Sequence, residues 1–285
     1  MGTLLQIAAR ALDAEAAERA MEGALGAVEQ VEQLMSFHAD DSELTRLNLE
    51  ASRRPVAVHP WTYAVLQRAL RIAALSDGLF DIAVAPVLVE SGLLPRREGR
   101  LPHAGGWRSV VLLPGLRVSF RRPMLIDLGG IAKGFAVDQA IHALRLGGCI
   151  EAVVNAGGDL RRYGPEPRRI HLRRRGGVVP LAELRCGAVA TSSPYVARPG
   201  YLSQPIGCIV DPRQRRSWDG VASVTVAART CVVADALTKL AALAGPACRP
   251  LLARFGAHAL WDTDPESGAA PWQNDHPISS PDTSC

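Results

Sequence analysis

The stretch Asp127-Leu128-Gly129-Gly130-Ile131-Ala132-Lys133-Gly134 is the most informative part of this chain. It follows the apolar run Met124-Leu125-Ile126, which predicts a strand, and it opens a helical pattern of apolar residues that reaches Leu144. A carboxylate, two glycines and a lysine at a helix start suit an anion with its metal ion, because backbone N–H groups and the helix dipole attract phosphate. A structural strand-to-helix turn would look the same. The glycine spacing matches neither a Rossmann fingerprint nor a P-loop.

Further motifs stand around this stretch in a fixed order. They are Met1-Gly2-Thr3; Met35-Ser36 with Ser42-Glu43-Leu44 and Leu47-Asn48; Asp77-Gly78-Leu79-Phe80-Asp81; Asn155-Ala156-Gly157-Gly158-Asp159; Ile209-Val210-Asp211-Pro212; and Ala234-Asp235-Ala236-Leu237. In this order the set resembles the FAD:protein FMN transferases, the ApbE-type flavin transferases, over about residues 1–260.

The resemblance implies a reaction that moves the FMN half of FAD onto a Ser or Thr hydroxyl of an acceptor flavoprotein, with Mg²⁺ as cofactor and AMP as leaving group. Hard oxygen ligands suit that metal ion. Two other functions stay open. One is an FAD hydrolase that gives FMN and AMP, and the other is a protein that binds FAD with little or no transfer activity.

The resemblance also implies a fold. It predicts a single α+β domain of a T-fold-like kind over residues 1–261, with the flavin and the metal in a cleft. The mixture of helices and strands without strict βαβ alternation independently favours α+β. Residues 262–285 are polar and hold four prolines, so we expect a disordered tail.

Seven positions match flavin-contacting positions of the family, and an eighth, Asp159, is expected near the same site; Met35 and Asp159 also have structural alternatives. A methionine in a helical stripe is equally typical of a core, and an aspartate after two glycines is typical of a turn. The eight are Met35, Leu79, Phe80, Asp81, Asp127, Lys133, Asp159 and Ile209.

The resemblance places the metal at the backbone carbonyl of Gly130 and the carboxylate of Asp235. The family usually has a threonine four residues after that aspartate, where this chain has Lys239, and Thr238 stands one residue earlier. Thr238 could still ligate through its hydroxyl or carbonyl. A lysine ammonium cannot ligate a metal. It could occupy the cation's place, pair with Asp235 one helical turn away, or bind the pyrophosphate.

A second departure concerns the catalytic positions, which the resemblance assigns to Asp235, Lys133 and Cys208. Cys208 stands where the family usually has a histidine, a candidate to assist removal of the acceptor's hydroxyl proton. A thiol accepts hydrogen bonds poorly. If that histidine is essential, transfer is slow or absent, and if an aspartate is the base, the cysteine is tolerated.

Composition excludes several other classes of protein. The 285 residues carry a net charge of +4, which is too small to indicate nucleic-acid binding. No apolar run approaches the roughly 20 residues that span a bilayer. The N-terminus lacks the pattern of a signal peptide, so we expect a cytoplasmic protein, or an exported or membrane-anchored one if an upstream segment is missing. No pair of the six cysteines has metal-ligand spacing.

Periodicity predicts the main helices and strands. Helices are expected at 12–36, 60–76, 133–147 and 232–244, with Ser42 as the N-cap of a short helix. Strands are expected at 109–113, 116–120, 151–155, 168–174, 187–190, 206–210, 221–227 and 257–261. The arginine-rich segment 161–175 predicts a solvated hairpin or, alternatively, a docking patch for an acidic partner protein.

Overall fold

The computed structural model of this chain describes residues 3–98, 101–102, 105–174, 177–192, 209–218, 220 and 223–262. Helices and strands are mixed along the chain, so the α+β class is confirmed. The chain forms two compact units, which we call unit 1 (residues 29–132 and 193–220) and unit 2 (residues 2–28, 133–192 and 221–285). The segment 263–285, predicted to be a disordered tail, lies outside the described residues.

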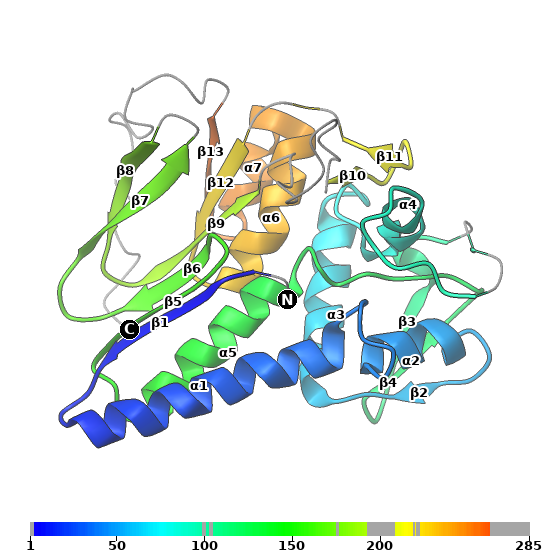
Figure 1. Ribbon diagram of the computed structural model, residues 1–285. Helices are drawn as coiled ribbons and strands as arrows, with labels where there is room; N and C mark the ends of the chain where they lie inside the picture. Colours follow the sequence, from blue (N-terminus) through cyan, green and yellow to red (C-terminus); the bar gives the residue numbers. More distant parts are fainter. Residues whose placement is uncertain are drawn as a thin grey trace. The chain divides into compact units, whose positions relative to one another are not determined.

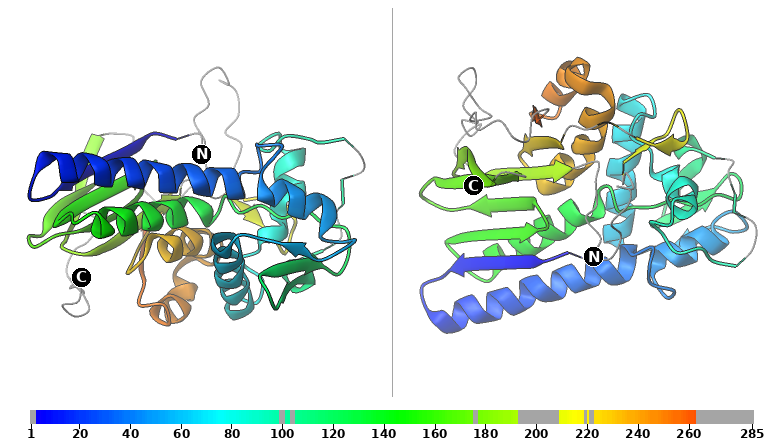
Figure 2. Two further views of the ribbon diagram at one scale, coloured as in Figure 1. Left: turned by 90° about the horizontal axis from the view of Figure 1, so that it is seen from below. Right: turned by 45° about the horizontal axis from the view of Figure 1, so that its top comes forward.

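Unit 2 is built on a six-stranded antiparallel sheet with β1 and β13 at its edges (Figure 2). Its strands, in spatial order, are β1 (Leu5–Arg10), β5 (Glu151–Ala156), β6 (Asp159–Tyr163), β9 (Gly187–Ser192), β12 (Ser223–Ala228) and β13 (His258–Asp262). Strand β5 shows why one face is covered: Ala152, Val154 and Ala156 are buried, and the residues between them are half-buried. This alternation is the period of two expected of a strand with one face in the core.

Two helices of unit 2 carry the polar residues of interest. Helix α6 (Cys231–Ala244) packs against β6, β9 and β12, and α5 (Ala132–Leu146) lies beside it (Figure 1). Helix α5 ends at glycine as predicted, with Gly148 at φ +80°. The sequence analysis did not predict strand β1. This strand pairs with β5 in antiparallel register, with Ile7 opposite Val154.

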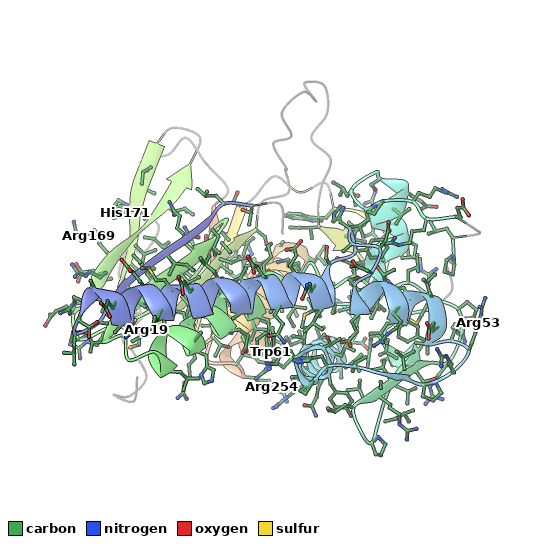
Figure 3. The ribbon with its side chains drawn as sticks, turned by 60° about the horizontal axis from the view of Figure 1, so that its bottom comes forward. Arg19, Arg53, Trp61, Arg169, His171 and Arg254 are labelled. Atoms are coloured by element: carbon green, nitrogen blue, oxygen red, sulfur yellow. The ribbon has the colours of Figure 1, made fainter. Side chains whose placement is uncertain are left out.

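A hairpin of β7 (Arg168–Arg174) and β8 (Gly177–Leu184) folds over part of the sheet. Its apolar side chains form a small core with those of β9 and β12, which includes Leu172, Leu184, Val189 and Ala227. Arg169 and His171 lie on its outer side (Figure 3). The predicted solvated hairpin is therefore correct for this part of the arginine-rich segment.

The beginning of that arginine-rich segment is not solvated, and that part of the prediction is wrong. Arg162 is 2% exposed and donates to Glu151 Oε1 at 3.1 Å and to the carbonyl oxygens of Glu166 and Leu184. Arg161 donates to Asp138 Oδ1 at 2.7 Å. These guanidinium groups are tolerated inside because carboxylates and carbonyls satisfy them.

Unit 1 contains short helices around a small sheet. Pro60 begins α3 and Ser42 caps α2 by accepting from Thr45 N at 3.0 Å, both as predicted. Its helices are α2 (Glu43–Glu50), α3 (Pro60–Leu75), α4 (Ala85–Glu90) and the 3₁₀ turns η1 (Ile82–Val84) and η2 (Trp107–Ser109); its strands are β2 (Val56–Ala57), β3 (Val110–Leu113), β4 (Arg117–Phe120), β10 (Val210–Asp211) and β11 (Arg216–Ser217). Helix α1 (Ala14–Met35) contributes residues to both units.

The segment Met124–Ile126 is not the predicted strand. The backbone of Ile126 forms hydrogen bonds with a side chain and not with a neighbouring strand. Ile126 N donates to Asn48 Oδ1 at 2.8 Å, and Asn48 Nδ2 donates to Ile126 O at 2.9 Å. A buried backbone group needs a partner of some kind, and the asparagine amide supplies both. The apolar residues therefore reflect burial of Met124 and Ile126 and not strand pairing.

One helical stretch of the described residues, Cys231–Ala253, has the length and apolar composition of a membrane-crossing helix. It comprises α6, η3 (Gly245–Cys248) and α7 (Arg249–Ala253), and much of it is buried within unit 2. Leu237 and Leu240, for example, have no exposed surface. Packing in the core of unit 2 accounts for this composition.

Candidate functional site

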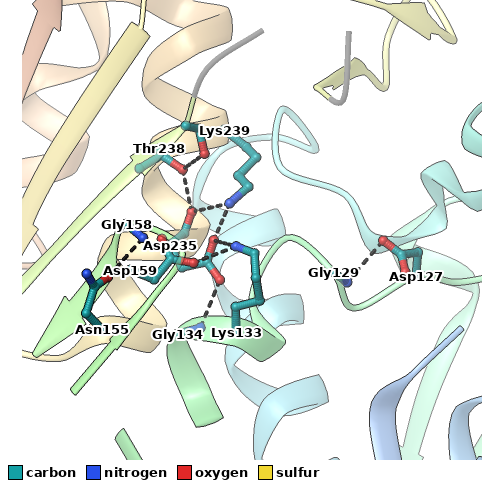
Figure 4. Close-up of polar contacts among 11 residues, drawn as sticks. Asp127, Gly129, Lys133, Gly134, Asn155, Gly158, Asp159, Asp235, Thr238 and Lys239 are labelled. Atoms are coloured by element: carbon teal, nitrogen blue, oxygen red, sulfur yellow. Dashed lines mark hydrogen bonds and ion pairs between the residues drawn. The ribbon is translucent and has the colours of Figure 1, made fainter. Parts of the chain in front are cut away.

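Two lysines and two aspartates of unit 2 meet in one cluster, which we call the Lys–Asp cluster (Figure 4). Lys133 Nζ lies 2.5 Å from Asp159 Oδ2 and 3.7 Å from Asp235 Oδ1. Lys239 Nζ contacts the same Asp235 Oδ1 and lies 3.0 Å from the carbonyl oxygen of Asp235. Three motifs that are far apart in the sequence are thus joined through charged side chains.

The crossing of α5 and α6 positions this cluster, and it depends on Gly134. A Cβ atom at Gly134 would lie 2.3 Å from the carbonyl oxygen of Cys231 and 2.8 Å from Asp235 Cβ, distances that no side chain tolerates. Gly134 lies in the first turn of α5, where N–H groups have no partner within the helix. Its N–H donates to Asp235 Oδ2 at 3.0 Å.

The two helices cap each other. While Asp235 of α6 accepts from the first turn of α5, Asp138 of α5 accepts from the first turn of α6, from Cys231 N and Val232 N at 2.9 Å each. Each carboxylate lies at the positive end of the other helix, where a negative charge is stabilised. Arg161 also pairs with Asp138. This reciprocal capping fixes the direction in which Asp235 faces the lysines.

The protonation of the cluster follows from burial and from its internal charges. Burial raises the pKa of Asp159, Asp235 raises it further, and Lys133 opposes both, with a result of about 6. Burial would also raise the pKa of Asp235, but Lys133 and Lys239 outweigh it and hold that pKa below its ordinary value. Burial lowers the pKa of Lys133, yet Asp235 and Asp159 outweigh it and raise the pKa. Asp235 and Lys133 are charged at neutral pH.

The sequence left three roles open for Lys239. In the structure, Lys239 forms an ion pair with Asp235, one helical turn away. Thr238 is fully buried, and its hydroxyl donates to the carbonyl oxygen of Asp235 at 2.7 Å. Ser192 Oγ lies 2.7 Å from that hydroxyl. Because a hydroxyl has one proton, Ser192 is the donor of this second bond.

These residues do not fit the implied Mg²⁺. Asp235 Oδ1 already faces two ammonium groups, Asp235 Oδ2 accepts from Gly134 N, and the Thr238 hydroxyl is engaged. Two unit charges of like sign 4 Å apart repel by about 4 kcal/mol at an effective dielectric constant near 20, and a divalent ion doubles this against each lysine. In the part of the chain that the structure describes, no group of three or more His, Cys, Asp or Glu residues could hold a metal ion.

Four predicted flavin-contacting residues of unit 1, Met35 and the segment 79–81, have structural roles in that unit. Asp81 accepts from Ala83 N at 2.8 Å and from Trp107 N at 3.1 Å. Burial raises the pKa of Asp81, while these two backbone donors oppose the shift. Phe80 and Met35 are 4% and 3% exposed, so both belong to the core, and Leu79 is half-buried.

The first motif divides between the units. Asp127, in unit 1, accepts from Gly129 N at 3.0 Å, and Gly130 is half-buried in the turn before α5. Lys133, in unit 2, belongs to the Lys–Asp cluster. The predicted metal ligands Gly130 and Asp235 likewise belong to different units, so their pairing is not tested, and the ammonium groups beside Asp235 argue against a metal ion there.

The remaining predicted site residues lie around residue 210. Ile209 is 2% exposed, and its carbonyl oxygen accepts from Trp218 N at 2.7 Å. Asp211 accepts from Arg213 N at 2.8 Å, the turn role expected of an aspartate before proline. Cys208 lies outside the described residues.

Sequence reasoning missed Asp138 although a signal was present. Asp138 lies on the helical stripe that Phe135 and Ile141 mark as buried, and a carboxylate on such a stripe needs a buried partner. Sequence reasoning also left Asn155 ambiguous. Its Oδ1 accepts from Gly158 N at 2.9 Å, so Asn155 shapes the turn that delivers Asp159.

Comparison with known proteins assigns the chain to a family. The sequence matches the ApbE family over residues 1–261. It is 31% identical over 232 residues to the FAD:protein FMN transferase of Vibrio cholerae, which covers 74% of this chain and 69% of that protein. It is also 31% identical to the FAD:protein FMN transferase of Rhodobacter capsulatus, over 91% of this chain and 53% of that protein. This chain belongs to the ApbE family.

Solved structures agree in fold. The flavin transferase ApbE from Vibrio cholerae superposes with a TM-score of 0.77 at 26% identity, over 92% of this chain and 90% of that chain. The ApbE protein of Thermotoga maritima superposes with a TM-score of 0.76 at 29% identity, over 91% of each chain. The predicted ApbE-type fold is therefore confirmed.

Proposed function

We propose that this chain is an FAD:protein FMN transferase that attaches FMN to a Ser or Thr hydroxyl of an acceptor flavoprotein and releases AMP. The observation that carries the proposal is the Lys–Asp cluster, because Lys133, Asp159 and Asp235 come from three separate motifs and meet at contact distance. The curated relatives with the name FAD:protein FMN transferase support it.

The chemistry asks for positive charge beside a pyrophosphate. In the transfer, the acceptor hydroxyl oxygen bonds to the phosphorus of the FMN half, and the bond from this phosphorus to the bridging oxygen breaks. The electron pair of that bond leaves with AMP, and the hydroxyl proton is released to the medium. Negative charge grows on the bridging oxygen, where ammonium groups held in place before the reaction are most effective.

The lysines of the cluster meet this requirement. Lys133 has about a third of its side chain exposed and Lys239 a fifth, whereas Asp235 has none. The carboxylates therefore hold both ammonium groups in place, and part of each lysine side chain lies at the surface of unit 2, where we place the pyrophosphate. The resemblance would add Mg²⁺, but we assign it no step because the described oxygens of the cluster do not fit it.

In-gel flavin fluorescence tests the proposal. The purified chain, FAD and an acceptor domain with a family-type Ser/Thr segment are incubated, and the denatured acceptor is examined for bound flavin. We expect a fluorescent acceptor band that is absent when the target hydroxyl is replaced by alanine. A dark acceptor with release of AMP would identify an FAD hydrolase instead. A dark acceptor without release of AMP, with bound FAD retained, would identify a flavin-binding protein.

A further inference from the structure

We propose that the ammonium group of Lys239 takes the place of the divalent cation in this chain, so that transfer of FMN proceeds without a metal ion. This inference rests on the proposed function and deepens it. It concerns one site, the Lys–Asp cluster, and one ligand chemistry, the pyrophosphate of a dinucleotide.

The ammonium group of Lys239 lies among oxygen atoms. Lys239 Nζ contacts a carboxylate oxygen and a backbone carbonyl oxygen, both of Asp235. Carboxylate and carbonyl oxygens are the protein ligands that hard cations such as Mg²⁺ use. The lysine thus occupies a place among oxygens of the kind that would attract the metal.

The charges of the Lys–Asp cluster balance without a metal ion. The cluster holds two ammonium groups and two carboxylates, and Asp235 has no exposed surface. A buried carboxylate is stable when it is paired and hydrogen-bonded, and Asp235 is already paired with both lysines and bonded to Gly134 N. A divalent ion would add two positive charges beside ammonium groups that already neutralise the carboxylates.

Lys239 has one more N–H donor than its contacts with Asp235 use. An ammonium group has three N–H donors. Among the described residues, Lys239 Nζ donates to two oxygens, both on Asp235. We assign the remaining donor to a phosphate oxygen of the dinucleotide, and a fifth of the Lys239 side chain is exposed. The Thr238 hydroxyl, which the resemblance leaves as a further ligand, donates its proton to the Asp235 carbonyl oxygen and lies 2.7 Å from Ser192 Oγ.

The proposal leaves the atoms of the reaction unchanged. The acceptor oxygen bonds to the FMN phosphorus, the bond to the bridging oxygen breaks, and AMP leaves with the electron pair. The positive charge near the bridging and phosphate oxygens comes from Lys239 together with Lys133. Both charges belong to the folded chain, so chelation cannot remove them.

Two measurements on the unaltered chain test this inference. The first compares FMN transfer in excess EDTA and in excess Mg²⁺, and we expect rates within about twofold of each other. The second titrates Mn²⁺ into the chain with FAD present and follows free Mn²⁺ by electron paramagnetic resonance, and we expect no bound ion. Transfer that stops in EDTA, or one Mn²⁺ bound per chain, would overturn the proposal.

Two variants sharpen the test. Lys239→Thr restores the residue usual in the family, and we expect it to bind Mn²⁺ and to transfer FMN only with added metal. Lys239→Met keeps the length of the side chain without its charge, and we expect transfer to fall by about 100-fold with or without Mg²⁺. Full activity of Lys239→Met in EDTA would contradict the proposal. Circular dichroism establishes that each variant is folded.

The Mn²⁺ titration separates this inference from the proposed function. If the unaltered chain labels no acceptor with or without metal, the proposed function fails, and the titration still decides the role of Lys239. Mn²⁺ bound by Lys239→Thr but not by the unaltered chain supports the substitution of lysine for metal. Mn²⁺ bound equally by both refutes it.

Discussion

The aspartates of unit 1 and unit 2 that accept from backbone N–H groups differ in how far along the chain their partners lie. In unit 1, Asp81, Asp127 and Asp211 each accept from the backbone N–H two residues further on. In unit 2, Asp235 accepts from Gly134 N, 101 residues away, and Asp138 accepts from Cys231 N, 93 residues away. Asp127 and Asp211 of unit 1 therefore shape the chain locally, and Asp81 adds a bond from Trp107 N, 26 residues away, whereas Asp138 and Asp235 of unit 2 join segments 93 and 101 residues apart.

This difference predicts that the long-range carboxylates matter most for stability. Removing one partner of a buried charged pair costs about 4 kcal/mol, and Asp138 also caps α6. We expect Asp138→Ala to lower the free energy of unfolding by about that amount, measured by chemical denaturation.

Glu15→Ala is the matched control, because Glu15 is also a helical carboxylate paired with an arginine but is 86% exposed. Such a surface pair contributes about 0.4 kcal/mol. Equal losses in the two variants would show that the reciprocal capping adds little to stability.

The next largest effect concerns the helix crossing. Gly134→Ala forces a methyl group against the carbonyl of Cys231, and we expect a loss of about 3 kcal/mol in the free energy of unfolding. Gly23→Ala in α1 is the control, since a Cβ atom there meets nothing within 4 Å. That substitution should be neutral or stabilising. A stable Gly134→Ala variant would mean that α5 and α6 are not held at this distance.

A pH effect follows from Asp159, whose pKa rises from 3.8 to about 6 in the folded chain. The folded chain therefore binds this proton more tightly than the unfolded chain does. The contribution of Asp159 to stability falls as the pH rises from 3.8 to about 6, by at most about 1.4 kcal/mol per pH unit. Asp235, with a lowered pKa, titrates below this window.

The check is denaturation of the unaltered chain and of Asp159→Asn across this pH range. The difference in unfolding free energy between them should change between pH 3.8 and 6 and be constant above it. A constant difference throughout would show that Asp159 keeps an ordinary pKa in the folded chain.

The smallest effect is expected for a local carboxylate of unit 1. Asp127→Ala removes the bond from Gly129 N, and a typical hydrogen bond contributes about 1 kcal/mol. Chemical denaturation should give a loss of that size. A loss as large as that of Asp138→Ala would erase the distinction between the two units.

Much of the fold could be predicted because the signals are local. Helices α1, α3, α5 and α6 have apolar periodicity, and the structure places them within two residues of the predicted ranges. The segment Met124–Ile126 could not be predicted, because the pairing of its backbone with Asn48 depends on a residue 78 positions away.

The site was predictable only in part for the same reason. Each motif is visible in the sequence, and the family resemblance groups them. The meeting of Lys133 with Asp159 and Asp235 depends on how α5, β6 and α6 pack, which no local pattern states. The burial of Arg162 beside Glu151 is a further case, since an arginine run ordinarily predicts exposure.

The mass of the intact acceptor protein, after incubation with FAD and either the unaltered chain or Lys133→Met, is the most direct test of the central claim. We expect the unaltered chain to add the mass of one FMN less water, and Lys133→Met, which keeps the side chain's length without its charge, to add none in the same time. Equal addition by both chains would contradict the assignment of the Lys–Asp cluster to the chemistry, and no addition by the unaltered chain would contradict the transferase itself.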